Sequence, residues 1–267
     1  MRKLFLLLSI ITVLSFSTAP AMADVYGTAD VEFVGYVRGL QLNMSMTSQD
    51  GTTTGDKFAG LTSLDITNLS TTGLPSDSYL GLGAERAFCI DLFDGLPFVF
   101  DGVPGYDKPH AYDVVSLDDA PDPKAVPSGS TGMGSDRAAY IAELLNTHTY
   151  NTAQTAAAMQ VAIWEIVDEN YLGTTTNAWD VSYGSGDFYL NYTPGVGSVE
   201  ETVAGIANTW LDALPDTTPA TSFSRYTALS HDGGKELQDF VVVPVPAAVL
   251  LGVLGLGAVG LKLRRHA

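Results

Sequence analysis

The chain has almost no cysteine: Cys89 is the only one among 267 residues. A lone cysteine cannot form an internal disulfide, and the sequence has no set of cysteines and histidines spaced for zinc. It also lacks a phosphate-binding loop, a dinucleotide-binding glycine motif and the spaced acidic pattern of an EF-hand. These absences remove the commonest cofactor sites, and they single out one unpaired thiol whose role has to be explained.

Basic residues are also scarce, with 13 lysines and arginines against 30 aspartates and glutamates. Five of the 13 lie near the two ends of the chain: Arg2, Lys3, Lys262, Arg264 and Arg265. All 30 acidic residues lie between residues 24 and 243, so this span has thirty negative against eight positive charges, a formal net charge of −22. So acidic a surface repels nucleic acid and anionic lipid and excludes both as partners. It favours cations and basic protein surfaces.

Residues 1–23 have the three parts of a secretory signal peptide. A basic start, Met1-Arg-Lys3, precedes an apolar run from Leu4 to Phe16 that is too short to span a membrane as a regular helix. The segment Ala21-Met-Ala23 then supplies an A-x-A cleavage site. We therefore expect an exported protein whose mature chain begins at Asp24.

Residues 244–267 form a second terminal segment. The proline motif at 244–248 is followed by an apolar run to Leu261 and by a basic end at 262–265. This order resembles the PEP-CTERM sorting signal, in a variant where Val245 replaces the commoner Glu. The resemblance implies a Gram-negative bacterium, an exosortase-type sorting enzyme as partner, and a place on the cell surface or in the extracellular matrix. A plain membrane anchor with its basic end in the cytoplasm is the alternative. Both interpretations place the domain at 24–243 outside the inner membrane.

The order of the predicted elements indicates the fold class of residues 24–243. Strand patterns come first, helical patterns follow and two strands end the span, which indicates an α+β fold. Strands are expected at 31–42, 79–92, 111–117, 222–229 and 237–243, with short strands and turns at 43–77 and mainly loop at 94–136. Helices are expected at 137–147 with Asp136 as cap, at 152–170, and at 199–214 behind a Ser198/Glu201 capping box.

The helix expected at 152–170 carries the most informative polar residue. Thr152 is its expected N-cap, and apolar residues recur at three- and four-residue spacing along one face. That face contains Ala156, Ala157, Ile163, Trp164 and Val167, and a polar edge is expected from Glu165, Asp168 and Glu169. Gln160 lies on the apolar face, where an unpaired amide would cost roughly 1–3 kcal/mol. It is therefore either hydrogen-bonded in the core or consumed chemically.

Cys89 offers that chemistry, because it lies in an apolar stretch typical of a strand. A thiolate that attacks a glutamine carboxamide and expels ammonia gives an internal thioester, and proximity can lower such a barrier by roughly 7–11 kcal/mol. The segments Phe88-Cys89-Ile90 and Gln160-Val-Ala-Ile-Trp164 resemble the motifs of the bacterial thioester domain, or TQXA domain, of surface adhesins. Met159 stands where that family often has Thr. The resemblance implies a Cys89–Gln160 thioester in a β-rich barrel or sandwich with an inserted helical subdomain.

The favoured hypothesis is a non-enzymatic exported protein, without cofactor or metal, that bonds covalently to amines. An amine, for example a lysine of a target protein or matrix, would attack the Gln160 carbonyl and free the Cys89 thiol. The product would be an isopeptide-like link that serves adhesion or anchoring. Apolar neighbours would limit hydrolysis by excluding water: Phe88, Ile90, Ile163 and Trp164.

Three other interpretations stay open. In a structural matrix or polysaccharide-associated protein, Cys89 and Gln160 would be inert core residues. A cysteine hydrolase would pair Cys89 with His110 or His148, although no local signature of such an enzyme surrounds the cysteine. Calcium could bind clustered aspartates, although acidic loops are usually just solvated. Those clusters are Asp91 with Asp94, Asp118 with Asp119 and Asp122, and Asp136.

Overall fold

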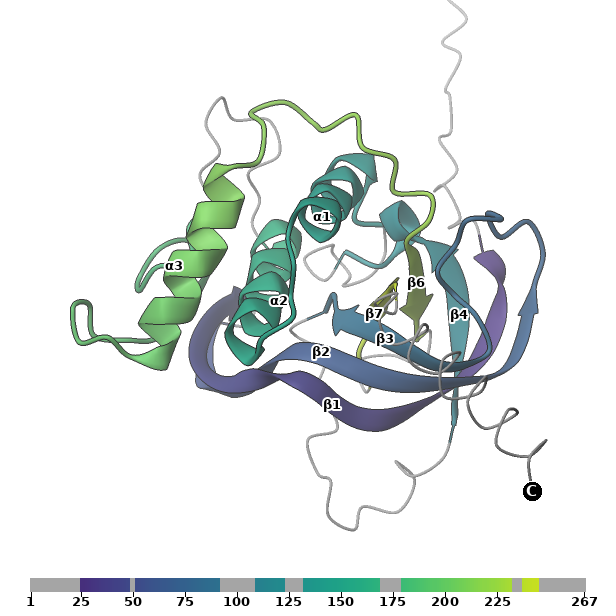
Figure 1. The fold of residues 1–267 in the computed structure, drawn as a ribbon, viewed down its shortest axis with the longest axis horizontal. Helices are drawn as coiled ribbons and strands as arrows, with labels where there is room; N and C mark the ends of the chain where they lie inside the picture. Colours follow the sequence, from purple (N-terminus) through teal and green to yellow (C-terminus); the bar gives the residue numbers. More distant parts are fainter. Residues whose placement is uncertain are drawn as a thin grey trace, which may run out of the picture.

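The computed structural model describes residues 25–48, 51–91, 109–122, 132–168, 179–231 and 237–244. Within these ranges, seven strands and three α-helices form a strand-rich α+β structure, which confirms the predicted fold class. Figure 1 shows a curved layer of strands beside a group of helices. The predicted signal peptide at 1–23, and all but the first residue of the predicted sorting segment at 244–267, lie outside the described residues.

The helices interrupt the sequence of strands, as predicted. The strands are β1 (Val25–Ser48), β2 (Gly51–Thr71), β3 (Gly83–Cys89), β4 (His110–Ser116), β5 (Phe188–Leu190), β6 (Thr227–Ser230) and β7 (Phe240–Val243). The helices are α1 (Ser135–Thr147), α2 (Ala153–Asp168) and α3 (Val199–Asp212), with a short 3-10 turn at Leu117–Asp119. Helices α1 and α2 lie between β4 and β5 in the chain, and α3 lies between β5 and β6.

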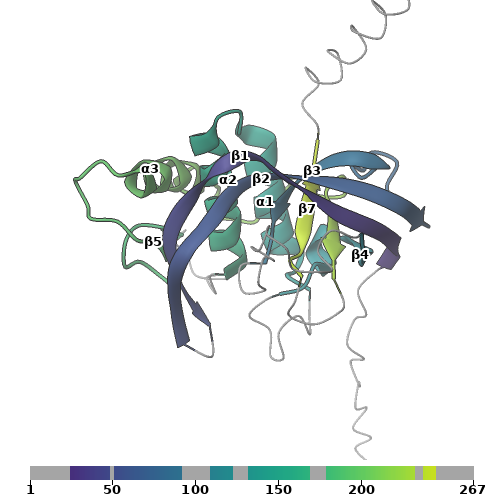
Figure 2. The same cartoon turned by 90° about the horizontal axis from the view of Figure 1, so that it is seen from below.

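Six of the described strands close into a ring. The order β2-β3-β7-β6-β4-β1 returns to β2, because β1 also pairs with β2 along almost its whole length. All pairings are antiparallel. Strand β5 is the exception to the ring, since it pairs with Met44–Met46 near the far end of β1. The strands thus form a closed barrel, and the long β1–β2 hairpin continues beyond it toward the helices (Figure 2).

The β1–β2 hairpin is the largest correction to the sequence prediction. Residues 43–77 were expected to form short strands and turns, yet β2 is one strand of 21 residues, and β1 has 24 residues. Pairing between the two strands overrides the weak strand preference of glycine, serine and aspartate. Gly39 and Gly60 lie opposite each other, and added Cβ atoms would lie 2.3 and 2.2 Å from carbonyl oxygens of the facing strand. Only glycine fits this close approach.

Helix α2 is buried on all sides between the hairpin and the other helices. Every residue from 156 to 168 is buried, and the helix contacts β1, β2, β3, β5, α1 and α3. Thr152 caps it as predicted: its Oγ1 accepts from the Thr155 N–H at 3.1 Å, and Thr155 Oγ1 accepts from the Thr152 N–H at 3.0 Å. The predicted polar edge is wrong for Glu165 and Asp168, which are buried within the packed helices. Its third residue, Glu169, lies outside the described residues.

The two outer helices differ in how they begin. Helix α1 follows Gly134 without a side-chain cap, so the predicted capping by Asp136 is wrong. Asp136 instead lies in the first turn, where its negative charge interacts favourably with the helix dipole. Helix α3 has the predicted cap, since Ser198 Oγ accepts from the Glu201 N–H at 3.2 Å. In the described part of the chain, no helix is both long enough and apolar enough to cross a membrane.

Candidate functional site

Cys89, at the end of β3, pairs with a neighbouring strand on one side only. On the β7 side, Cys89 lies opposite Phe240, and the Ile90 N–H donates to the Asp239 carbonyl at 3.0 Å. On the other side, pairing with β2 ends where Ala87 lies opposite Thr62. Beyond that pair β2 continues into the hairpin. The N–H and C=O of Cys89 therefore have no partner in β2.

Gln160 of α2 fills this gap. Its Oε1 accepts from the Cys89 N–H at 2.9 Å, and its Nε2 donates to the Cys89 carbonyl at 2.6 Å. The carboxamide therefore pairs with Cys89 much as a neighbouring strand would. Gln160 is 0% exposed and Cys89 is 2% exposed, so water does not compete for these bonds. Two residues that the sequence motifs link across 71 positions are in direct contact.

This pairing fixes the orientation of the Gln160 amide relative to the Cys89 main chain. An N–H that already donates to Oε1 would stabilise the negative charge that develops on this oxygen when a nucleophile adds to Cδ. The Cys89 carbonyl, which accepts from Nε2, would hold the nitrogen as it leaves. In such a reaction Cys89 would supply a thiol, an oxyanion donor and an acceptor from a single residue.

The environment of Cys89 keeps its thiol protonated at neutral pH. Burial raises the pKa of the thiol well above its ordinary value, and the carboxylates of Asp91 and Asp239 raise it further. A hydrogen bond from the Gln238 side chain acts in the opposite direction. Any reaction of the sulfur would therefore require it to lose its proton in the reacting step, because the resting thiol is not a thiolate.

Gln238 is the site residue that the sequence analysis missed. It is 2% exposed, its Nε2 donates to the Asp91 carbonyl, and its own main-chain carbonyl accepts from the Tyr112 hydroxyl at 3.1 Å. Its Oε1 has no hydrogen-bond partner among the described residues. The available signal was a polar pair, Gln238 and Asp239, inside an otherwise apolar strand pattern at 237–243.

The apolar residues predicted around the site are all buried. Phe88 lies edge-on to Tyr150, with ring centroids 5.1 Å apart, and Trp164 lies edge-on to Phe188 at 6.2 Å. The exposed fractions are 0% for Phe88 and Ile163 and 1% for Ile90 and Trp164. The site therefore has the dry surroundings that a hydrolysable bond requires, although its shielding role stays a prediction.

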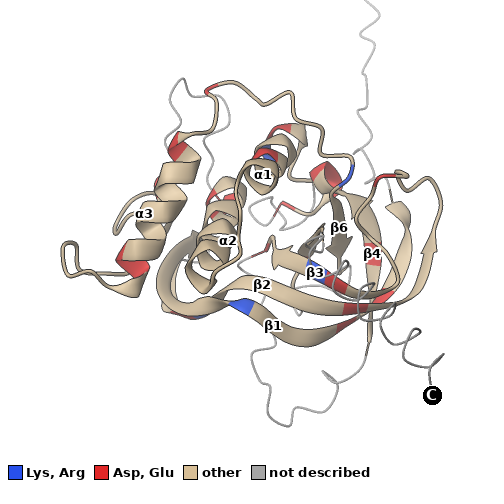
Figure 3. Ribbon diagram, in the orientation of Figure 1, with Lys and Arg blue, Asp and Glu red and all other residues tan. Residues whose placement is uncertain are grey.

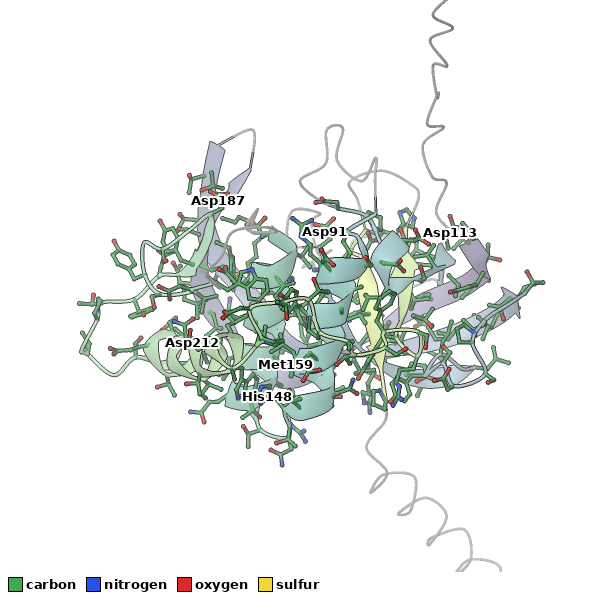
Figure 4. All side chains as sticks on the ribbon, turned by 90° about the horizontal axis from the view of Figure 1, so that it is seen from above. Asp91, Asp113, His148, Met159, Asp187 and Asp212 are labelled. Carbon is green, nitrogen blue, oxygen red and sulfur yellow. The ribbon has the colours of Figure 1, made fainter. Side chains whose placement is uncertain are left out.

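The histidines proposed as partners of Cys89 have other neighbours. His148 stacks on Trp210 with ring centroids 4.7 Å apart, and His110 lies edge-on to His231 at 6.5 Å. Figure 4 shows His148 and Asp91, which is two residues after Cys89, toward opposite sides of the molecule. The structure thus places His148 with α3 and not with the cysteine.

The acidic residues are spread over the barrel and the helices (Figure 3). Among the described residues, no group of three or more His, Cys, Asp or Glu side chains is arranged to hold a metal ion. Asp94, one of the residues considered for calcium, lies outside the described residues. Comparison of the chain with family models, curated proteins and solved structures gives no match. Its function must therefore be inferred from the site itself.

Proposed function

We propose that residues 24–243 are an exported thioester domain, in which Cys89 and Gln160 form an internal thioester that bonds covalently to amines of a target. The observation that carries this proposal is the two-point pairing between the Gln160 carboxamide and the Cys89 main chain. A core glutamine needs hydrogen-bond partners in any protein. Here both partners belong to the chain's one thiol-bearing residue, which supports a chemical role.

Formation of the bond requires no cofactor. Cys89 Sγ attacks Cδ of Gln160, the S–H proton passes to the amide nitrogen, the C–N bond breaks and ammonia leaves. During the attack the Cys89 N–H stabilises the developing oxyanion, and the Cys89 carbonyl accepts from the departing nitrogen. Because both residues are held by packed elements, the reaction gains from proximity and orientation.

Use of the bond reverses the roles of nitrogen and sulfur. A primary amine, such as a target lysine, attacks Cδ, its proton passes to sulfur, and the Cys89 thiol is released as an amide forms at position 160. The incoming nitrogen takes the place that Nε2 occupies in the structure, opposite the Cys89 carbonyl. The net charge of −22 between residues 24 and 243 favours lysine-rich targets.

The terminal segments give the proposal its location. A signal peptide at 1–23 would export the protein, and residues 244–267 would present it to an exosortase-type enzyme or hold it in the membrane. The domain would then act in adhesion or anchoring on the surface or in the matrix of a Gram-negative bacterium. No enzyme activity is part of this proposal, because the thioester is consumed when it reacts.

The intact mass of the mature domain tests the proposal. The expected mass is one ammonia below the sequence mass, and thiol reagents should leave Cys89 unlabelled until denaturation or methylamine treatment. Methylamine should release the thiol and remain attached at residue 160. Cys89→Ala and Gln160→Ala should each have the full mass of their own sequences. A wild-type domain with full sequence mass in every preparation would instead identify Cys89 and Gln160 as inert core residues of a structural protein.

A further inference from the structure

Gln238 lies beside Cys89 but has no part in the steps above. The register places Cys89 opposite Phe240, the first residue of β7, and Gln238 lies two residues before Phe240. Main-chain contact continues one step beyond the strand, because the Ile90 N–H donates to the Asp239 carbonyl. The Gln238 side chain then reaches the Asp91 carbonyl, two residues after Cys89. In agreement with this placement, the Gln238 side chain lowers the pKa of the Cys89 thiol, against the larger effect of burial.

The orientation of Gln238 is set by its other contacts. Its Nε2 carries two hydrogens, and one of them goes to the Asp91 carbonyl. The other remains for the sulfur. The Tyr112 hydroxyl holds the main chain of Gln238 in place at 3.1 Å. Its Oε1 is buried and, within the described residues, has no hydrogen-bond partner, which is a costly arrangement unless a ligand satisfies it during the reaction.

We propose that Gln238 is the positioning residue for the reacting sulfur and amine. Its Nε2–H stabilises negative charge on Cys89 Sγ, both when the sulfur attacks Gln160 and when it leaves during aminolysis. Its Oε1 accepts an N–H of the ammonia that departs or of the amine that enters. This role rests on the proposed function, and it adds a second glutamine to the pair that the sequence predicts.

Two variants separate this role from ordinary packing. Gln238→Leu removes both polar atoms, and Gln238→Glu keeps the size but offers the sulfur no N–H donor at neutral pH. Each should slow methylamine-induced thiol release at least tenfold and lower the fraction of ammonia-deficient protein. The pH–rate profile of thiol release should also move to higher pH, a shift that a packing role would not produce. Asn208→Leu, which alters another carboxamide that bonds to main chain, is the control and should react at the wild-type rate.

The outcomes distinguish the two claims. Folded Gln238→Leu or Gln238→Glu protein that reacts at the wild-type rate with an unshifted pH profile would overturn the role of Gln238 alone. A wild-type domain that shows neither an ammonia deficit nor a methylamine adduct would overturn the proposed function and this role with it. If Gln238→Leu does not fold, the rate and pH profile of Gln238→Glu decide.

Discussion

Helices α2 and α3 each direct one carboxamide to the main chain of another segment, but in different surroundings. On α2, Gln160 pairs with both main-chain groups of fully buried Cys89. On α3, Asn208 accepts from the Val181 N–H at 3.0 Å and donates to Asp180 and Ser182 in a half-buried loop. The same functional group therefore bonds to a half-buried loop in one region and to the main chain of the buried cysteine in the other.

This difference shows that burial and neighbours, and not the amide itself, make Gln160 a candidate for chemistry. Helix α3 has one buried stripe, which contains Val203, Ala204, Ala207 and Leu211. Helix α2 has no solvent-facing side from residue 156 to residue 168. A helix enclosed in this way can hold a reactive group away from water, whereas a covering helix cannot.

The largest expected effect comes from removing the two carboxamides. In a Cys89→Ala background, which excludes any thioester, Gln160→Leu leaves two buried main-chain groups unpaired, at roughly 1–3 kcal/mol each. Asn208→Leu should cost about 1 kcal/mol, because its partners are nearer to solvent. Urea unfolding of Cys89→Ala alone, and of Cys89→Ala combined with Gln160→Leu or with Asn208→Leu, measures both losses in the free energy of unfolding. Equal losses would remove the distinction between the two helices.

A second comparison uses two glycines, one on strand β2, which packs against α2, and one on α3. Gly60→Ala places a Cβ 2.2 Å from the Arg38 carbonyl, at a φ of +153° that favours glycine, and should cost roughly 1–3 kcal/mol. Gly205→Ala on α3 meets open space and should stabilise the helix by roughly 0.5–1 kcal/mol. Thermal unfolding should therefore shift in opposite directions. A neutral Gly60→Ala would show that the two strands of the hairpin can move apart enough to accept the added methyl group.

The smallest effects are expected from the pH dependence of stability, which should have opposite signs in the two regions. In Gln160→Leu the Cys89 thiol is free, and its pKa is higher in the folded than in the unfolded state. The folded state is therefore fully stabilised below the unfolded pKa of about 8.5, and above it the free energy of unfolding falls by up to about 1.4 kcal/mol per pH unit. Near α3, burial opposes ionisation of Asp180, but hydrogen bonds from Ser182 and Asn208 outweigh it and lower its pKa. That stabilisation is present above the unfolded pKa and is lost as the pH falls.

Denaturation between about pH 8 and 9.5 tests the alkaline half. Tyrosines such as Tyr36 and Tyr112, whose folded pKa values are also raised by burial, add a slope of the same sign as the pH approaches about 10. Cys89→Ala combined with Gln160→Leu should therefore have a shallower slope than Gln160→Leu alone, because no thiol remains. Denaturation between pH 5 and 3 tests the acid half, in which Asn208→Leu should flatten the dependence on pH. Equal alkaline slopes in Gln160→Leu and in the double variant would assign the dependence to groups other than Cys89.

The helices and the contact between Cys89 and Gln160 could be predicted because each depends on short stretches of sequence. Thr152 and Ser198 have the residue types that cap helices, and the apolar spacing after each follows a helical period. Gln160 and Cys89 were linked through short motifs, and the structure places them in contact. Burial of Glu165 could not be predicted, because a carboxylate at that position on an isolated helix would be expected to face solvent.

The elements that were missed depend on partners far away in the chain. Strand β2 is rich in Thr, Gly and Ser, and its length follows from the ladder with β1, not from its own preferences. Gln238 becomes a neighbour of Cys89 only because β7 pairs with β3 in one register. A shift of one residue would reverse the faces of the β7 side chains and move Gln238 away from the Asp91 carbonyl to which it donates.

Strand β7 also has a mechanical consequence. It ends at Val243, directly before the segment predicted to anchor the protein, and pairs with both β3 and β6. If the chain is tethered at that end and a target is bonded at Gln160, tension enters through β7 and leaves through α2. The strand that bears Cys89 lies between these two points, paired with β7 on one edge and bonded to Gln160 on the other. Pulling would therefore load the contacts around the reacted site directly, while α3 would lie beside the line of force.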